Sequence, residues 1–335
     1  MRFAVLLLLF DIVSARSANK QASTIPSRNH SKRIARSLDS VAANDPTRSH
    51  AVGPGSTGSA VLRAQILLDR ANYSSGEIDG FYGKNMRGTV RAFQKEHGLA
   101  DNGMVGLETW RALNADGAPV VTPYMIVEEN TAGPFEKIPE DMGAKAALPA
   151  LNYESALEGL AEKFHCSPRT LEALNPGKRF DRPGETITAP NVATAPVPQA
   201  SKLVVDGSDG SVTALDAGGR VLARFAASVG SQHDPLPKGS WKILGVRRQP
   251  EFHYNPALFW DADSREAKAT IAAGPNNPVG VVWISLSKPH YGIHGTPEPG
   301  KIGYTQSHGC IRLTNWDASK LADMVKPGTP AILTE

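Results

Sequence analysis

The sequence predicts a multidomain protein of the α+β class, helical in its first third and rich in β-strands in its last third. At 335 residues the chain is long for one domain. Apolar residues recur at helical spacing between residues 56 and 114, whereas short apolar runs separated by glycine-rich turns follow residue 201. We therefore expect a helical bundle, a middle region of mixed α/β structure, and a β-rich, sandwich-like C-terminal domain.

The composition favours a packed protein and excludes some partners. Hydrophobic residues make up 41% of the chain and charged residues 21%. The formal net charge is only +3, and the basic excess lies mainly near the N-terminus. No basic stripe is interleaved with aromatic residues, so we expect no nucleic-acid partner.

The N-terminus has the pattern of a short secretory signal. Arg2 is followed by an unbroken apolar run over residues 4–10 and by small residues at 13–15. Asp11 interrupts the pattern, and an unusual N-terminus of a cytoplasmic protein stays open as the alternative. The run is too short to span a bilayer. We predict a signal peptide over 1–15, a location in the periplasm or cell envelope, and a disordered linker over 16–55.

Residues 56–114 carry three helical patterns separated by turn sequences rich in glycine and aspartate. Alone, this predicts a small three-helix bundle. The segments 78–83 (IDGFYG), 92–99 (AFQKEHGL) and 102–110 (NGMVGLETW) resemble the peptidoglycan-binding domain type 1. The resemblance implies that the bundle binds peptidoglycan, and a purely structural appendage is the alternative.

The middle region, residues 124–190, has a weaker pattern. A strand is expected at 124–127 and two short helices at 156–164 and 170–174. The second helix and the PGETI segment at 183–187 resemble the second half of a LysM module, but the stretch 132–152 interrupts the first half. A plain spacer domain is equally compatible with these short periods.

A proline-rich linker over 191–200 leads to the C-terminal domain at 201–335. One helix is expected after Thr314, because Thr314 and Asp317 form a capping-box-like start. The other elements predicted in this domain are strands, at 203–205, 211–215, 221–225, 240–246, 281–286, 292–294, 310–313 and 331–333.

A cysteine and nearby histidines carry the chemistry of this last domain. Cys310 is one of only two cysteines in the chain, and it lies in the segment 307–312 (SHGCIR). If the segment is extended, His308 and Cys310 share one face of a strand. We expect His294 to lie on an adjacent strand. A thiol beside an imidazole is the minimal equipment for nucleophilic acyl transfer. The other cysteine, Cys166, is expected to be a buried apolar side chain.

The segments 294–296 (HGT) and 307–310 (SHGC) resemble the catalytic signature of the L,D-transpeptidases of the YkuD type. Supporting pieces stand in order at 236–239, 274–280 and 327–330. The resemblance implies a nucleophile, Cys310, and a base, His294, whose ring is oriented by the carbonyl of Gly295. The residues that it implies for oxyanion binding and support of the site are Ser307, His308 and Gly309, and for substrate binding Arg312 and Tyr291.

The implied reaction is a two-step acyl transfer. A peptidoglycan tetrapeptide stem gives its third residue to Cys310 as a thioester, and the terminal D-alanine leaves. An amine on another stem then attacks, which forms a 3→3 cross-link. Water as acceptor would give an L,D-carboxypeptidase, and other amines would give stem exchange or protein anchoring. The resemblance also implies acylation by carbapenems and no metal or organic cofactor.

Other site chemistries are weaker. Zinc ligation by His290, His294, His308 and Cys310 is conceivable, but no acidic general base accompanies them as in HEXXH sites. A papain-like order would place the cysteine before its histidine. A non-catalytic wall-binding protein is a different class, which the intact pair of His294 and Cys310 argues against. The aromatic-rich segment 249–268 is either a lid over the site or a packed excursion.

Overall fold

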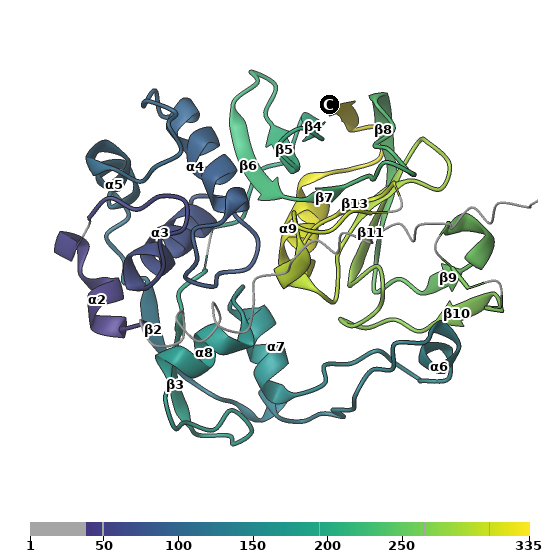
Figure 1. The fold of residues 1–335 in the computed structure, drawn as a ribbon, viewed down its shortest axis with the longest axis horizontal. Coiled ribbons are helices and arrows are strands. Elements are labelled where there is room, and N and C mark those ends of the chain that lie inside the picture. The colour runs from purple at the N-terminus through teal and green to yellow at the C-terminus, as the bar shows by residue number, and fades with distance from the viewer. Residues whose placement is uncertain (1–37, 49, 194, 261, 264, 308) are drawn as a thin grey trace, which may run out of the picture.

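The computed structural model describes residues 38–48, 50–193, 195–260, 262–263, 265–307 and 309–335. The chain has the mixed α+β architecture that the sequence predicts, with a helical bundle beside a β-rich domain (Figure 1). The predicted signal peptide lies outside the described residues. No helix within the described ranges is long and apolar enough to cross a membrane.

The bundle forms as predicted, because the apolar stripe of its first helix is buried against the other two. Val61, Leu62 and Ile66 are fully buried in this core. A two-residue strand follows the first helix and leads into the loop before the second. The elements are α3 (Ser59–Arg70), β1 (Tyr73–Ser74), α4 (Lys84–Glu96) and α5 (Leu107–Leu113).

The predicted linker is wrong for its last part, which is folded. Residues 40–48 form α2 (Ser40–Asn44) and η1 (Pro46–Arg48). The Asp39 side chain caps α2, and Ala43 is fully buried in the bundle core. A capping aspartate before a single buried alanine is too short a pattern to stand out from a polar stretch.

In the middle region, two antiparallel strands enclose two helices. Ser155 and Ser167 cap these helices through their hydroxyl groups. The first strand starts three residues earlier than predicted, and the resemblance to LysM stays a prediction. The elements are β2 (Val121–Met125), η2 (Glu128–Asn130), α6 (Met142–Ala146), α7 (Ala156–Lys163), α8 (Pro168–Leu174) and β3 (Thr186–Pro190).

The C-terminal domain contributes nine strands to a ten-stranded ladder in the order β1-β6-β5-β4-β14-β8-β11-β12-β13-β7. All eight predicted strands are present, with ends that differ by up to two residues. The predicted helix starts after Thr314, whose hydroxyl accepts a hydrogen bond from the backbone N–H of Asp317. The elements are β4 (Lys202–Asp206), β5 (Ser211–Leu215), β6 (Val221–Ala226), β7 (Ser228–Val229), β8 (Gly239–Arg248), β11 (Val282–Leu286), β12 (Gly292–His294), β13 (Ile311–Arg312), α9 (Asn315–Met324) and β14 (Pro330–Thr334).

Strand β8 changes partner midway along its length. Residues 239–242 pair with β14, and residues 243–248 pair with β11. The ladder is therefore two half-sheets joined through β8, and a strand that passes between sheets in this way makes a corner. Apolar residues of both half-sheets share one core with α9, among them Val205, Ile284 and Leu321.

The aromatic-rich segment 249–268 packs against the middle region. It contains β9 (Phe252–Tyr254) and η3 (Pro256–Leu258), and β9 pairs with β10 (Ala269–Ile271). Leu151, Tyr254 and Ile271 form a small buried cluster at this contact, with α6 beside it. The segment is thus a packed excursion that meets the insertion of the middle region.

The bundle is joined to the edge of the C-terminal domain's strands in the ten-stranded ladder. Strand β1 pairs in parallel with β6, where Tyr73 stands opposite Arg224. The Arg224 guanidinium is buried, and it donates to Thr89 Oγ1 of α4 at 2.9 Å and to Asp209 Oδ2 at 2.8 Å. A charge-assisted bond to a buried guanidinium is among the stronger hydrogen bonds, so this contact favours a fixed docking of the bundle.

Candidate active site

His294 ends β12, between β11 and β13, and only 4% of its surface is exposed. Its Nδ1 lies 2.7 Å from the carbonyl oxygen of Gly295. Since a carbonyl only accepts, Nδ1 carries the proton and Nε2 keeps its lone pair. Trp283, opposite His294 on β11, stacks on the imidazole with ring centroids 5.4 Å apart.

Cys310 directly precedes β13, which runs parallel to β12. In this pairing Ile293 stands opposite Ile311, and both are buried in the core. Alternate residues of a strand point to opposite faces, so His294 and Cys310 both point to the face away from that core. The thiol donates a long contact of 3.8 Å to the carbonyl oxygen of His290.

Burial keeps both groups neutral. It lowers the pKa of His294 to about 3, with the Arg312 guanidinium adding to the shift and the bond to Gly295 opposing it. Burial also raises the pKa of the Cys310 thiol, against the influence of the Gly292 backbone and of Arg312. A neutral imidazole beside a protonated thiol suits a base that takes the proton as the sulfur attacks.

The loop before Cys310 is braced from inside. Ser307 Oγ donates to the carbonyl oxygen of Cys310 at 2.5 Å, and the Ser307 N–H donates to Gly230 O at 3.0 Å. Gly309 has a φ of +90°, and a Cβ there would lie 2.7 Å from the ring of Tyr291. The Tyr291 ring therefore occupies the space where a side chain at position 309 would lie. Only glycine permits this close approach.

The other predicted site residues surround this loop. Arg312 stands opposite His294 on β13, and its guanidinium reaches Gln306 O at 3.4 Å. Burial raises the pKa of Tyr291, with Asp234 and Cys310 adding to the shift, and the Tyr291 ring packs beside Gly309, the residue before Cys310. His308 lies outside the described residues.

Across the described part of the chain, no three His, Cys, Asp or Glu side chains gather as they would round a metal ion. His290 approaches Cys310 through its backbone carbonyl. Cys166 is buried as predicted, and burial raises its pKa well above the usual value.

Two residues that the sequence reasoning missed complete the surroundings of His294. One is Trp283, which stacks on the ring, and the other is Asn315, the first residue of α9. A Cβ on Gly295 would lie 2.1 Å from Asn315 Oδ1, so the Asn315 amide packs directly against the backbone that orients His294. Strand alternation could have placed Trp283 once its partner strand was known, but no local pattern points to Asn315.

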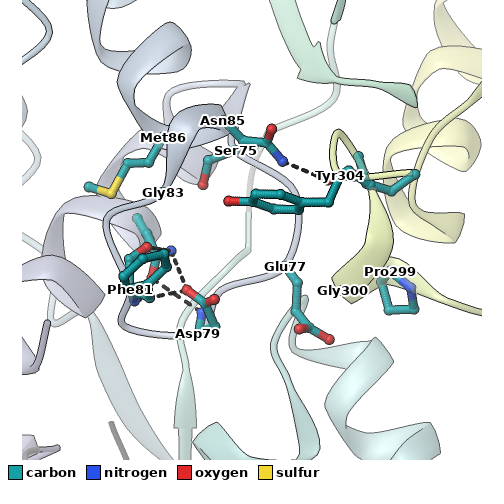
Figure 2. Close-up of a pocket in the computed structure, with 12 residues that line it drawn as sticks. Ser75, Glu77, Asp79, Phe81, Gly83, Asn85, Met86, Pro299, Gly300 and Tyr304 are labelled. Atoms are coloured by element: carbon teal, nitrogen blue, oxygen red, sulfur yellow. Dashed lines mark hydrogen bonds between the residues drawn. The ribbon is translucent and has the colours of Figure 1, made fainter. Parts of the chain in front are cut away.

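The start of α4, directly after the IDGFYG segment, packs against the loop that leads to Cys310. Asn85 donates to Ile302 O at 2.8 Å, and the Lys84 ammonium lies 5.2 Å from the centre of the Tyr304 ring. Figure 2 shows Tyr304 reaching into this contact and Glu77 beside Gly300, around a cavity of about 30 Å³. That volume suits a water molecule or two rather than an organic ligand.

A thiol and a neutral imidazole on one face of adjacent strands are the groups that a cysteine-dependent acyl transfer requires. The family model described as "L,D-transpeptidase catalytic domain" matches residues 200–333, and the one described as "Putative peptidoglycan binding domain" matches residues 57–113. The chain is 32% identical over 181 residues to the Bacillus licheniformis protein named "Putative L,D-transpeptidase YkuD", an alignment that covers 53% of this chain and 93% of the relative. A Bacillus subtilis protein of the same name is 31% identical, with coverage of 52% and 90%.

The chain therefore belongs to the L,D-transpeptidase family, and it is an enzyme that acts on peptidoglycan. Among solved structures, LD transpeptidase LdtMt1 in complex with imipenem is 22% identical. That match covers 44% of this chain and 62% of LdtMt1, with a TM-score of 0.33.

Proposed function

We propose that this enzyme joins peptidoglycan tetrapeptide stems through a Cys310 thioester and so forms 3→3 cross-links. The carrying observation is the placement of a neutral, buried His294 on the same face of adjacent strands as Cys310. The peptidoglycan-binding bundle docked on the same domain supports this substrate and a location in the periplasm or cell envelope.

In the first step, the Cys310 sulfur attacks the carbonyl of the third stem residue while Nε2 of His294 accepts the thiol proton. The oxygen becomes an oxyanion, and we propose that the backbone N–H groups of Gly309 and Cys310 donate to it. The intermediate collapses, the bond to D-alanine breaks, and the leaving amine takes the proton from His294. A thioester on Cys310 and free D-alanine are the products of this step.

In the second step, the amine of an acceptor stem attacks the thioester carbonyl and gives its proton to His294. The carbon–sulfur bond then breaks, and His294 returns the proton to the Cys310 sulfur. The new peptide bond joins the two stems, and the enzyme is restored. The Arg312 guanidinium, on the face that Cys310 and His294 share, is placed to bind a carboxylate of a stem.

The test is mass spectrometry of muropeptides after incubation of the full chain with purified tetrapeptide stems. We expect 3→3 dimers and released D-alanine with the natural enzyme, and neither with Cys310→Ala. Tripeptides without dimers would replace the proposal with an L,D-carboxypeptidase. Dimers formed by Cys310→Ala at the natural rate would overturn the cysteine mechanism.

Carbapenems present a strained carbonyl to the same thiol, so we propose that imipenem acylates Cys310. Intact-protein mass spectrometry would detect one added imipenem per chain. The adduct is expected on the peptide that contains Cys310 and not on the one that contains Cys166, whose thiol is buried.

A further inference from the structure

The first turn of α9, a helix near the centre of Figure 1, is where all three parts of the chain meet. Three successive residues of this turn each contact an upstream part, two of them the middle region and one the bundle. The pairs are Asn315 Nδ2 with Glu162 Oε1 at 3.0 Å, the Trp316 ring with the His165 ring at 5.2 Å between centroids, and Asp317 Oδ2 with Ser74 Oγ at 2.8 Å. Because α9 follows β13, these contacts lie a few residues from Cys310.

The Asn315 amide is wedged between two backbone segments of the catalytic domain. Its Oδ1 accepts a hydrogen bond from the N–H of Val281 at 3.1 Å. A Cβ at Gly280 or Gly295 would come within 2.0 or 2.1 Å of that oxygen, closer than side chains pack. The amide therefore fills the space that both glycines leave open, and Asn315 itself is only 1% exposed.

The segment that Asn315 braces is the one that orients His294. The Gly295 carbonyl accepts the Nδ1 proton of His294 at 2.7 Å, which fixes the tautomer and leaves Nε2 as the base. The backbone of His294 is also tied to the approach of α9, because the Leu313 N–H donates to His294 O at 2.8 Å. A displacement of Asn315 would thus move the Gly295 carbonyl and, with it, the imidazole of His294.

We propose that Glu162 of the middle region is a positioning residue for the acyl transfer, an inference that depends on the proposed role of His294 as the base. Glu162 Oε1 accepts from Asn315 Nδ2, whose other acceptor is the carbonyl of Pro275 at 3.1 Å. With both amide protons of Asn315 held by these acceptors, its Oδ1 stays packed against Gly295. The Gly295 carbonyl then stays in place to accept from His294 Nδ1. The middle region thereby contributes to the catalytic site without touching the substrate.

The chain contains a matched control on the same helix. Glu158 lies one turn before Glu162 on α7, and it also bonds the catalytic domain, accepting from Asn276 Nδ2 at 2.9 Å. Both carboxylates hold α7 to the catalytic domain, but only Glu162 bonds Asn315. A general loss of docking should affect both variants, whereas loss of positioning should affect only one.

The experiment compares Glu162→Ala, Glu162→Gln and Glu158→Ala in the full chain, with imipenem as the acylating probe and intact-protein mass spectrometry as the readout. We expect Glu162→Ala to lower the maximal acylation rate constant by about 10- to 100-fold, with the half-saturating imipenem concentration little changed. Glu162→Gln keeps an acceptor oxygen and should stay within about threefold of the natural enzyme. Glu158→Ala should do the same.

Natural rates in Glu162→Ala would overturn the proposal, and so would equal losses in Glu162→Ala and Glu158→Ala. A second readout is independent of turnover: the ¹⁵N-labelled His294 ring observed by NMR. The Nδ1–H signal should be slowed in exchange and hydrogen-bonded in the natural protein and in Glu162→Gln, and weakened in Glu162→Ala. If the natural enzyme forms no acyl-enzyme, the proposed function fails, while this signal still tests the positioning.

Discussion

Burial penalises the charged form both on the proposed catalytic face and at the junction where the upstream parts meet the C-terminal domain, but its consequences near neutral pH differ. On the catalytic face it lowers the pKa of His294 to about 3 and raises that of Cys310, so both groups stay neutral through the physiological range. At the junction it raises the pKa of Glu77 to about 8 and those of Glu162 and Asp317 to about 7. We therefore expect His294 and Cys310 to keep their neutral forms through ordinary pH changes, whereas the buried carboxyl groups at the junction are expected to titrate near neutrality.

The largest expected effect tests the catalytic side of this comparison. Cys310→Ala should abolish acylation by imipenem, and His294→Ala should slow it by about 10²- to 10⁴-fold, because the thiol proton then has no positioned acceptor. Stopped-flow fluorescence or mass spectrometry would measure the rate. Acylation of His294→Ala at the natural rate would show that another group is the base.

A second prediction concerns the glycine beside the nucleophile. Gly309→Ala should slow acylation by about 10-fold or more, since its Cβ displaces the Tyr291 ring next to Cys310. Gly219→Ala is the matched control, because Gly219 also has a positive φ, +84°, but no atom lies near its Cβ position. Both should lose on the order of 1–2 kcal/mol of stability from backbone strain, and only Gly309→Ala should lose activity.

The pH dependence of stability tests the buried carboxyl groups at the junction. The pKa of Glu77 is raised mainly by burial and secondarily by Asp79. The folded state therefore holds a proton that the unfolded chain releases. The stability from this group is complete below about pH 4.5 and is lost as the pH rises to about 8.

Between pH 5 and pH 8 the natural protein should lose on the order of 1–3 kcal/mol of unfolding free energy through this group. Glu77→Gln, which stays neutral, should lose less on the same rise, with the remainder due to Glu162 and Asp317. Thermal midpoints at both pH values measure the difference. Glu129→Gln, a change at an exposed residue of η2, is the control and should leave the pH dependence as it is.

The smallest expected effect concerns Arg312, whose charge lowers the pKa of Cys310 and of His294 alike. Arg312→Ala should raise both pKa values and slow alkylation of Cys310 by iodoacetamide about two- to fivefold at pH 8, because less thiolate is present. Arg312→Lys keeps the charge and should alkylate close to the natural rate. An unchanged rate in Arg312→Ala would mean that the guanidinium does not influence the thiol.

The proposed catalytic pair could be predicted from the sequence because its chemistry is local. His294 ends one short strand and Cys310 directly precedes another. Their apolar neighbours, Ile293 and Ile311, indicate which face of these strands is buried. The bundle helices were predictable for the same reason, since a stripe such as Val61, Leu62 and Ile66 repeats with the helical period. The folded stretch at Ser40–Asn44 was missed, because its single buried residue leaves no period to detect.

By itself the sequence determined the helical bundle, the β-rich domain with its helix α9, and the choice of Cys310 and His294 as the proposed catalytic pair. Only the tertiary structure decided what surrounds them. The register of β11 and β12 places Trp283 against the imidazole. Glu162, more than a hundred residues upstream, is linked to His294 through Asn315. Local periodicity records which side of an element is buried, but the partner on that side depends on how the elements pack, and no short stretch of sequence carries that information.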